Sequence, residues 1–287
     1  MKLATTLLAT TAAGAIAFAA AVALNGPENK TGQLMSPGTV KIEPGLIDYR
    51  LPGEYLASGH PVDAPVTPVR FPDGFEMMQY QVSAGDYALC VADGNCKPAD
   101  GAQAGADLPV TGIDYKDAVN YADWLSDRTG EGWRLPTDAE WTFAAAERFR
   151  DEILGPAGDV NNPAARWLAQ YRQEASNAAP LPEPQSFGHF GTNGKGVADI
   201  AGNVWEWTST CYVRATVEPD GQLARRIENC GVRVAAGRHR AYMSFFIRDG
   251  KSGGCAAGLA PTNLGIRLVR DPPSLLARMK ALVSLDG

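Results

Sequence analysis

Histidine is scarce in this chain. Only three are present, His60, His189 and His239, and they lie in three different segments without an H-x-x-x-H pair. Non-haem iron sites normally cluster histidines with a carboxylate, so these scattered residues do not indicate an iron enzyme.

An excess of basic charge is missing as well. The net charge of −6 gives no reason to expect nucleic acid or an anionic membrane surface as a partner.

Glycine and proline, by contrast, are abundant, with 31 and 20 copies in 287 residues. These numbers favour a loop-rich fold over a helical bundle. With 45% hydrophobic residues the chain can still bury a sizeable core. We find no internal repeat.

Residues 1–27 predict export. One lysine precedes an uncharged stretch rich in Ala, Leu, Thr and Val, and residues 21–23 read Ala-Val-Ala, the small-x-small form of a signal-peptidase site. Two outcomes stay open: cleavage after this motif, or retention of residues 3–24 as an anchor, since about 20 apolar residues suffice to span a bilayer. Both place the remaining chain in the periplasm or outside the cell, and only the second brings it to a membrane.

Export permits disulfides, and the chain has five cysteines. Cys90 and Cys96 flank an Asp-Gly-Asn turn, so a short local bridge is expected. Cys211 and Cys230 flank a turn-containing segment between two strand-like runs, and we expect them to pair next. The odd count then leaves Cys255 over.

Composition divides the rest of the chain into three parts. Residues 28–65 are polar and rich in Pro and Gly, which predicts a linker and lead-in. Residues 66–271 predict the domain itself, beginning with strands on either side of a Pro-Asp-Gly turn at 72–74. Residues 272–287 carry apolar residues at helical spacing and predict a short amphipathic helix, docked on the body or on a partner.

Two helices are well signalled inside the domain. Asp114 and Asp117 form a capping pair before an apolar run of helical period, which Gly130 closes. A second helix opens at Thr137, with Glu140 three residues later as a capping box.

Four sequence strings follow one another along the domain. They are QVSAGDYALC at 81–90, RLPTDAEW at 134–141, GVADIAGNVWEWT at 196–208 and NLGIRLV at 263–269. Each resembles, in order and approximate spacing, a signature of the formylglycine-generating-enzyme (sulfatase-modifying factor) family, such as RLPTEAEWE and GLYDMHGNVWEW. The resemblance implies an irregular α+β, C-type-lectin-like fold. It extends to the exported branch whose members accompany periplasmic nitrite reductases.

The third string carries an expected metal site. Trp205 and Trp207 alternate with Glu206, which predicts both indoles on one face of a strand, in the core, and the carboxylate on the other. The resemblance implies calcium bound by Asn203, the Val204 carbonyl and Glu206, because calcium prefers hard oxygen ligands. Asn177 resembles the start of a second calcium site, whose downstream aspartate is not found. The alternative is that Glu206 caps backbone amides and holds a loop.

One part of the family pattern is missing. The family's oxidase holds Cu(I) with two cysteines in a GGSxxCxxxxC arrangement, because soft thiolates suit that ion. Residues 231–254 contain no cysteine, and Ala241 and Phe246 fall where the thiolates belong. We therefore do not expect copper, and we assign no catalytic residue.

The resemblance also places several residues in the family's substrate groove: Arg238, His239, Arg240, Tyr242 and Arg248. Basic and aromatic side chains together suit a carboxylate, a phosphate or an acidic peptide. The alternative is ordinary solvated charge.

Three functions remain at this point. The first is a periplasmic accessory or binding protein that holds a polypeptide or small ligand in the groove, as in maturation of a respiratory enzyme such as nitrite reductase. The second is a metal-dependent oxidase or small-molecule-modifying enzyme of the same family, which needs a convergent ligand or acid–base cluster. The third is a sugar-binding lectin-like module, which only the fold supports.

Overall fold

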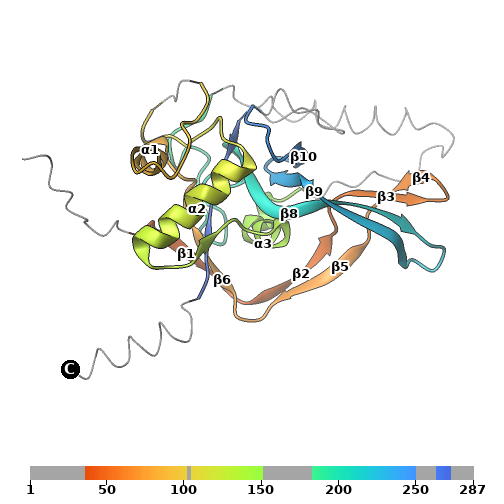
Figure 1. Cartoon of the computed structure of the whole chain (residues 1–287). Helices are drawn as coiled ribbons and strands as arrows, with labels where there is room; N and C mark the ends of the chain where they lie inside the picture. The colour runs from red at the N-terminus through yellow and green to blue at the C-terminus, as the bar shows by residue number, and fades with distance from the viewer. Residues whose placement is uncertain (1–35, 102–104, 151–182, 250–262, 273–287) are drawn as a thin grey trace, which may run out of the picture. The chain divides into compact units, whose positions relative to one another are not determined.

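The computed structural model describes residues 36–101, 105–150, 183–249 and 263–272 (Figure 1). Some expectations fall outside these ranges and stay untested: the export segment 1–27, the C-terminal helix beyond Pro272, Asn177 and Cys255.

The described elements are short, apart from two long strands. The strands are β1 (Thr39–Ile42), β2 (Gly45–Arg50), β3 (Glu54–Ala57), β4 (His60–Val62), β5 (Val66–Phe71), β6 (Phe75–Met78), β7 (Trp133–Arg134), β8 (Trp205–Val217), β9 (Leu223–Ala236), β10 (Arg240–Ser244), β11 (Leu264–Gly265) and β12 (Val269–Arg270). The helices are α1 (Ala84–Ala92), α2 (Tyr115–Thr129) and α3 (Asp138–Ala145), the last continued by the 3-10 turn η1 (Ala146–Arg148).

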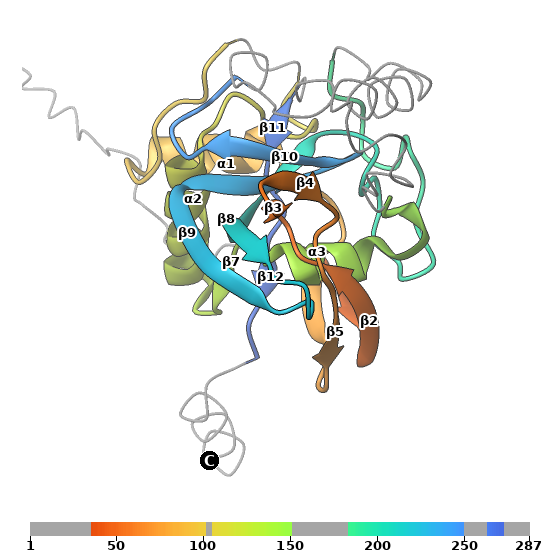
Figure 2. The same ribbon diagram turned by 90° about the vertical axis from the view of Figure 1, so that its right-hand side faces the viewer.

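Within the described ranges the strands form three sheets. One is antiparallel, in the order β1-β6-β12-β7. The largest runs β10-β9-β8-β3-β4, and β11 joins β8 in parallel. The third is the β2–β5 pair, which leaves β5 an edge strand, as Pro68 requires. In Figure 2, β9 curls across the front of the molecule beside β8.

The two predicted helices are confirmed together with their caps. Asp114 and Thr137 each accept a hydrogen bond from the backbone N–H three residues on, and each capping box is complete. Gly130 ends α2 in the left-handed conformation, with φ 73°. None of the helices in the described part has the length and apolar character needed to cross a membrane.

α1 was not predicted as a helix, although it lies in the first signature string. Ser83 caps it by accepting a hydrogen bond from the N–H of Asp86, so the local signal was a Ser-x-x-Asp box. Nine residues give the periodic pattern little length to show itself.

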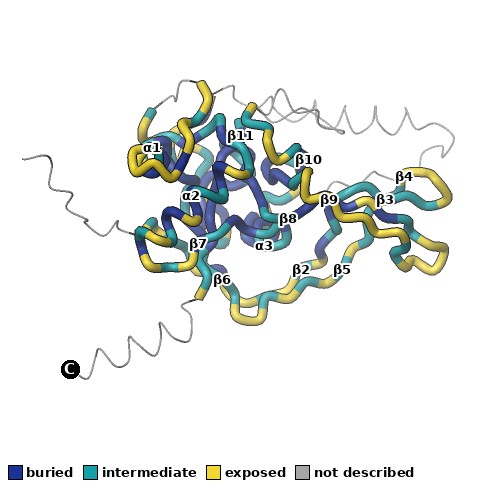
Figure 3. Tube along the Cα trace, in the orientation of Figure 1, coloured by how far each residue is buried: buried dark blue, intermediate teal, exposed yellow. Residues whose placement is uncertain are grey.

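The core lies on both faces of β8 (Figure 3). On one face, Trp205 and Trp207 pack in a cluster with side chains of α1 and α2, among them Tyr87 and Trp124. On the other, Trp141 of α3 packs in a second cluster with residues of β1 and β6. Because both faces are covered, the first four side chains of β8, residues 205–208, are all buried.

The predicted linker differs from what the structure shows. Residues 39–62 hold β1 to β4, and Ile42, Tyr49 and Tyr55 are buried there. The segment shows no sustained period because each strand has only three to six residues and the strands join different sheets. The ordered domain therefore begins well before Val66.

Candidate functional site

Glu206 lies at the centre of the molecule on β8, between its two tryptophans. Trp205 and Trp207 turn to the α1–α2 side, so the carboxylate turns to the α3 side, as the alternation predicted. All three side chains are buried, and Glu206 is 0% exposed. A carboxylate in such a place must be paired to stay ionised.

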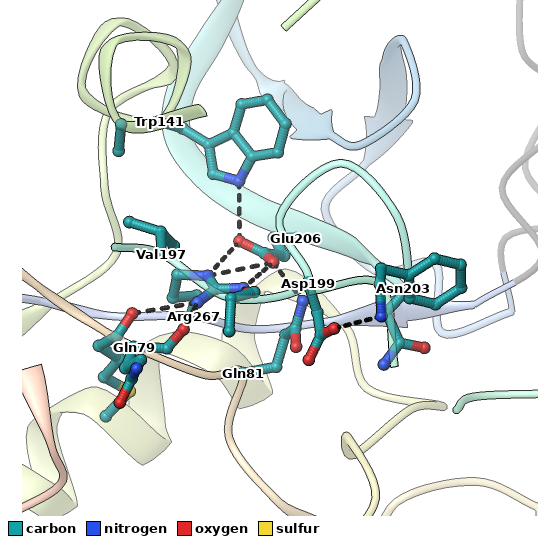
Figure 4. A network of polar contacts seen from close by, with 12 residues as sticks. Gln79, Gln81, Trp141, Val197, Asp199, Asn203, Glu206 and Arg267 are labelled. Atoms are coloured by element: carbon teal, nitrogen blue, oxygen red, sulfur yellow. Dashed lines mark hydrogen bonds and ion pairs between the residues drawn. The ribbon is translucent and has the colours of Figure 1, made fainter. Parts of the chain in front are cut away.

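The partner of Glu206 is Arg267 (Figure 4), and the Arg267 side chain is also 0% exposed. Arg267 Nε donates to Glu206 Oε2 at 3.0 Å, and Nη2 donates to Oε1 at 2.9 Å. Two neutral donors complete the set: Trp141 Nε1 at 2.7 Å from Oε2 and Gln81 Nε2 at 2.7 Å from Oε1. Four donors thus fill the lone-pair positions of the carboxylate.

The guanidinium of Arg267 is satisfied equally well. Its remaining N–H groups donate to the carbonyls of Met78 at 3.0 Å, Gln79 at 2.5 Å and Ala198 at 2.9 Å. All five donors of the group are therefore used. The members of this network come from all four signature strings: Gln81, Trp141, Glu206 with Ala198, and Arg267.

Asn203 and Asp199 hold the loop that approaches this centre. The Asn203 side chain accepts from the N–H of Gln185 at 2.9 Å and donates to its carbonyl at 2.8 Å. The buried Asp199 carboxylate accepts from the N–H groups of Gly188 at 2.6 Å and Phe190 at 2.8 Å. These side chains fix backbone in the manner of loop caps.

This arrangement does not fit the calcium ion expected at Asn203, Val204 and Glu206. Both carboxylate oxygens of Glu206 and the amide oxygen of Asn203 already accept from protein donors. A cation would have to displace Arg267, whose charge already balances the carboxylate. The geometry favours a structural role for Glu206, in which the carboxylate holds neighbouring segments together. It does so by accepting hydrogen bonds from side chains, whereas the sequence-based alternative was that it caps backbone amides. Calcium at this site therefore rests on the resemblance alone, and denaturation with and without the ion tests it.

Arg240, expected in the groove, lies inside the protein instead. Its Nε donates to Asp138 Oδ2 at 2.9 Å, and both side chains are almost fully buried. The hydroxyl of Tyr49 donates to the same oxygen at 2.6 Å. Burial raises the pKa of Tyr49 far above its usual value, and the charge of Asp138 raises it further, so the phenol keeps its proton.

Arg248 is likewise occupied by carboxylates, at the amino-terminal end of α2. It pairs with Asp117 and Asp100 and donates to the carbonyl of Pro98 at 3.1 Å. Two of the five expected groove residues therefore pair with carboxylates of the protein itself, and two of these carboxylates, Asp138 and Asp117, are almost fully buried.

The other three expected groove residues stay near β10. The hydroxyl of Tyr242 accepts from the N–H of Gly53 at 2.8 Å, and His239 Nδ1 lies 3.0 Å from the carbonyl oxygen of the next residue. Burial lowers the pKa of the Arg238 guanidinium, and the charge of Arg150 lowers it further. Their role in ligand binding remains an expectation.

A model of the sulfatase-modifying factor enzyme 1-like domain matches residues 25–272. The chain belongs to this formylglycine-generating-enzyme family. The match also covers β1 to β4, which agrees with the early start of the domain.

Some similar proteins are named as formylglycine-generating enzymes and others as inactive forms of that enzyme. The formylglycine-generating enzyme of Mycobacterium tuberculosis is 36% identical over 117 residues, 39% of this chain and 36% of that protein. The mouse protein named inactive C-alpha-formylglycine-generating enzyme 2 is 32% identical over 133 residues, 45% of this chain and 39% of that protein. The chain thus spans less than half the length of either relative.

Among solved structures, PvdO from Pseudomonas aeruginosa is similar, with a TM-score of 0.51 at 22% identity over 82% of this chain and 95% of that one. At this identity the likeness concerns the fold alone. Family membership and this likeness support the irregular α+β, C-type-lectin-like fold expected from the sequence.

Both predicted disulfides are confirmed, Cys90–Cys96 and Cys211–Cys230. Glu228 lies close enough to the second bridge for the three side chains to resemble a metal-ligand group. Sulfurs joined in a disulfide are not thiolates, and the thiolate is the form that ligates metal. The cluster is therefore no metal site in this state.

The partners of the buried charges were not predicted from the sequence. Gln81, Trp141 and Arg267 belong to the signature strings, but nothing in the strings themselves indicates that these side chains meet. The available signal was their presence in those strings together with a carboxylate that needed a counter-charge. Asp138, which holds Arg240, lies in the second string and had the same signal, whereas Tyr49 had none beyond its residue type.

A separate cavity of about 390 Å³ lies beside α3 and η1. Its lining residues are Ile47, Asp48, Thr142, Phe143, Ala146, Phe149 and Lys195. Lys195 Nζ lies over the ring of Phe143, and burial lowers the pKa of this amine to about 8, although the charge of Glu147 opposes the shift. The cavity thus combines aromatic walls with an amine whose pKa is lowered to about 8.

The first prediction concerns Glu206. Glu206→Gln leaves Arg267 charged, buried and unpaired, so the free energy of unfolding should fall by about 3–5 kcal/mol. Thermal and urea denaturation measure this loss, with Glu218→Gln, an exposed carboxylate at the end of β8, as the control that should change little. Calcium and a chelator should leave the wild-type Tm unchanged. If calcium raised the Tm of the wild type but not that of the variant, the result would contradict this prediction and support a calcium site at Glu206.

The second prediction concerns Lys195. Because the folded-state pKa is lowered to about 8, half of the amines are neutral and nucleophilic at that pH, and the fraction falls as pH decreases. Acetylation of Lys195 by acetic anhydride, followed by peptide mass spectrometry, should therefore rise with a midpoint near pH 8. In the urea-unfolded chain the midpoint should move to about 10.4, the usual value for lysine. Equal midpoints in the two states would contradict the partly buried position of the amine.

Proposed function

We propose that this chain is an exported member of its family that binds a partner polypeptide and does not generate formylglycine through copper. The observation that carries the proposal is the absence of cysteine between residues 231 and 254, where the family's oxidase places its Cu(I) ligands. Alanine and phenylalanine side chains cannot ligate Cu(I).

The surroundings of the two corresponding positions support this proposal. Ala241 is fully buried on β10, opposite Ala235 of β9. Phe246 is 61% exposed just beyond the strand. Ala241 thus belongs to the core and Phe246 to the surface, whereas two ligands of one ion would have to face the same point.

Four of the five cysteines are also bound in disulfides. The relative named as an inactive formylglycine-generating enzyme supports the proposal by analogy, since family members without the activity exist.

An apolar patch at the end of β10 supports a binding role. Phe245 and Phe246 are both exposed, and their rings lie edge to face with centroids 5.6 Å apart. Arg240 and Arg248, by contrast, are occupied by internal carboxylates. Aromatic residues in the centre of an interface contribute much of the binding free energy. The partner would therefore contribute apolar side chains here, more than acidic ones.

The resemblance to the exported branch makes a periplasmic respiratory enzyme, such as a nitrite reductase, the candidate partner. This choice rests on family analogy.

The third prediction tests the missing oxidase. The full chain, incubated with Cu(I), oxygen and a cysteine-containing sulfatase-type peptide, should leave the cysteine unconverted in mass spectrometry. The formylglycine-generating enzyme of Mycobacterium tuberculosis serves as the positive control. Copper-dependent conversion of the peptide by this chain would overturn the proposal and favour the enzyme interpretation.

The fourth prediction tests the binding face. Phe246→Asp should weaken binding to a purified periplasmic nitrite reductase at least tenfold, because a charge would replace an aromatic contact. Leu46→Asp, at another exposed apolar residue, on β2, is the matched control and should bind like the wild type. Surface plasmon resonance gives both affinities. No wild-type binding, or equal loss in both variants, would reject this partner or this face.

A further inference from the structure

The bridge between Cys211 and Cys230 has two unlike ends. It joins β8 to β9 where the pairing register of the two strands shifts on both sides of Cys211. Cys211 is only 8% exposed, whereas Cys230 is exposed on the outer strand. A thiol in solution can therefore approach the sulfur of Cys230 more easily than that of Cys211.

A fixed positive charge lies at the buried end. Arg233 Nη1 is 3.0 Å from Cys211 Sγ and also donates to the carbonyl of Ser209 at 2.6 Å. The guanidinium lies over the ring of Tyr115, 4.4 Å from its centroid, which helps to hold it there. A neighbouring arginine stabilises a thiolate, and a more stable thiolate leaves a disulfide faster.

A negative charge lies at the other end. Glu228 Oε1 is 3.8 Å from Cys230 Sγ, and Glu228 itself pairs with the exposed Arg226. A carboxylate at this distance disfavours a thiolate on Cys230. Both charges therefore favour the same direction of cleavage, with the electron pair going to Cys211.

We propose that the Cys211–Cys230 disulfide is a thiol–disulfide exchange site that accepts an exposed thiolate at Cys230. The incoming thiolate RS⁻ forms a new S–S bond with Cys230, the Cys211–Cys230 bond breaks, and Cys211 leaves as a thiolate beside Arg233. A second thiolate then attacks the R sulfur of the mixed disulfide. This attack releases RSSR and the Cys230 thiolate, and the Cys230 thiolate then takes up a proton. Two thiols are oxidised and one disulfide is reduced.

The second bridge of the chain provides an internal comparison. Cys90 and Cys96 are 0% and 7% exposed and lie within the α1–α2 core cluster. In the part of the chain that the structure describes, no arginine donates a hydrogen bond to either sulfur. Attack there requires local unfolding, so this bridge should survive conditions that open the exchange site.

The experiment uses the folded full chain with 2-mercaptoethanol as the thiol. Cys255 is first blocked with iodoacetamide, the thiol is added, and newly freed cysteines are trapped with a second alkylating reagent of different mass. Peptide mass spectrometry should find the mercaptoethanol adduct on Cys230 and the second label on Cys211. Cys90 and Cys96 should remain unlabelled. An adduct mainly on Cys211, or equal opening of the two bridges, would overturn the proposal.

A variant series tests the role of the charge. Arg233→Met should slow adduct formation about tenfold, because the leaving thiolate loses its counter-charge. Arg233→Lys keeps the charge and should recover part of the rate, which a purely structural role for Arg233 would not explain. Arg214→Met, at an exposed arginine of β8, is the control and should react like the wild type. An unchanged rate in Arg233→Met would also reject the proposal.

Discussion

Two opposite full charges, on Glu206 and Arg267, lie where solvent does not reach them. An unpaired charge in such a place would be strongly unfavourable, so each of the two charges has to balance the other. The same guanidinium then fixes three backbone carbonyls near β6 and the loop before β8. Arg267 thus connects the end of β6, the loop before β8 and β8 itself, which are far apart in the sequence.

The Glu206–Arg267 pair lies apart from the residues to which we assign functional roles. The inner half of β8 is held by Glu206 and by the tryptophans on its other face. The same strand continues outward to Cys211 and pairs with β9, which leads into β10 and the exposed Phe245 and Phe246. Side chains on that outer part can change without loss of the centre. A family member can thus keep the fold while its copper ligands are replaced, because function depends on the site and not on the fold.

The sequence predicted what local rules determine. Both capped helices and both disulfides were read from residues a few to about twenty positions apart. The partner of Glu206 is 61 residues away, beyond any local rule. Arg240 and Arg248 were expected in a groove from the family resemblance, and the charge of a side chain does not reveal whether it is buried. Their partners, Asp138 and Asp117, lie in the first turns of helices, where acidic residues are common for other reasons.

A double-mutant cycle on Glu206 and Arg267 tests this account most directly. Urea unfolding would be measured for the wild type, Glu206→Leu, Arg267→Met and the double variant. If the pair is the centre of the fold, each single variant leaves a buried charge unbalanced, and the double variant should be more stable than the sum of the two losses predicts, by about 2–3 kcal/mol. Strictly additive losses would mean that the two charges act independently, and would contradict the account.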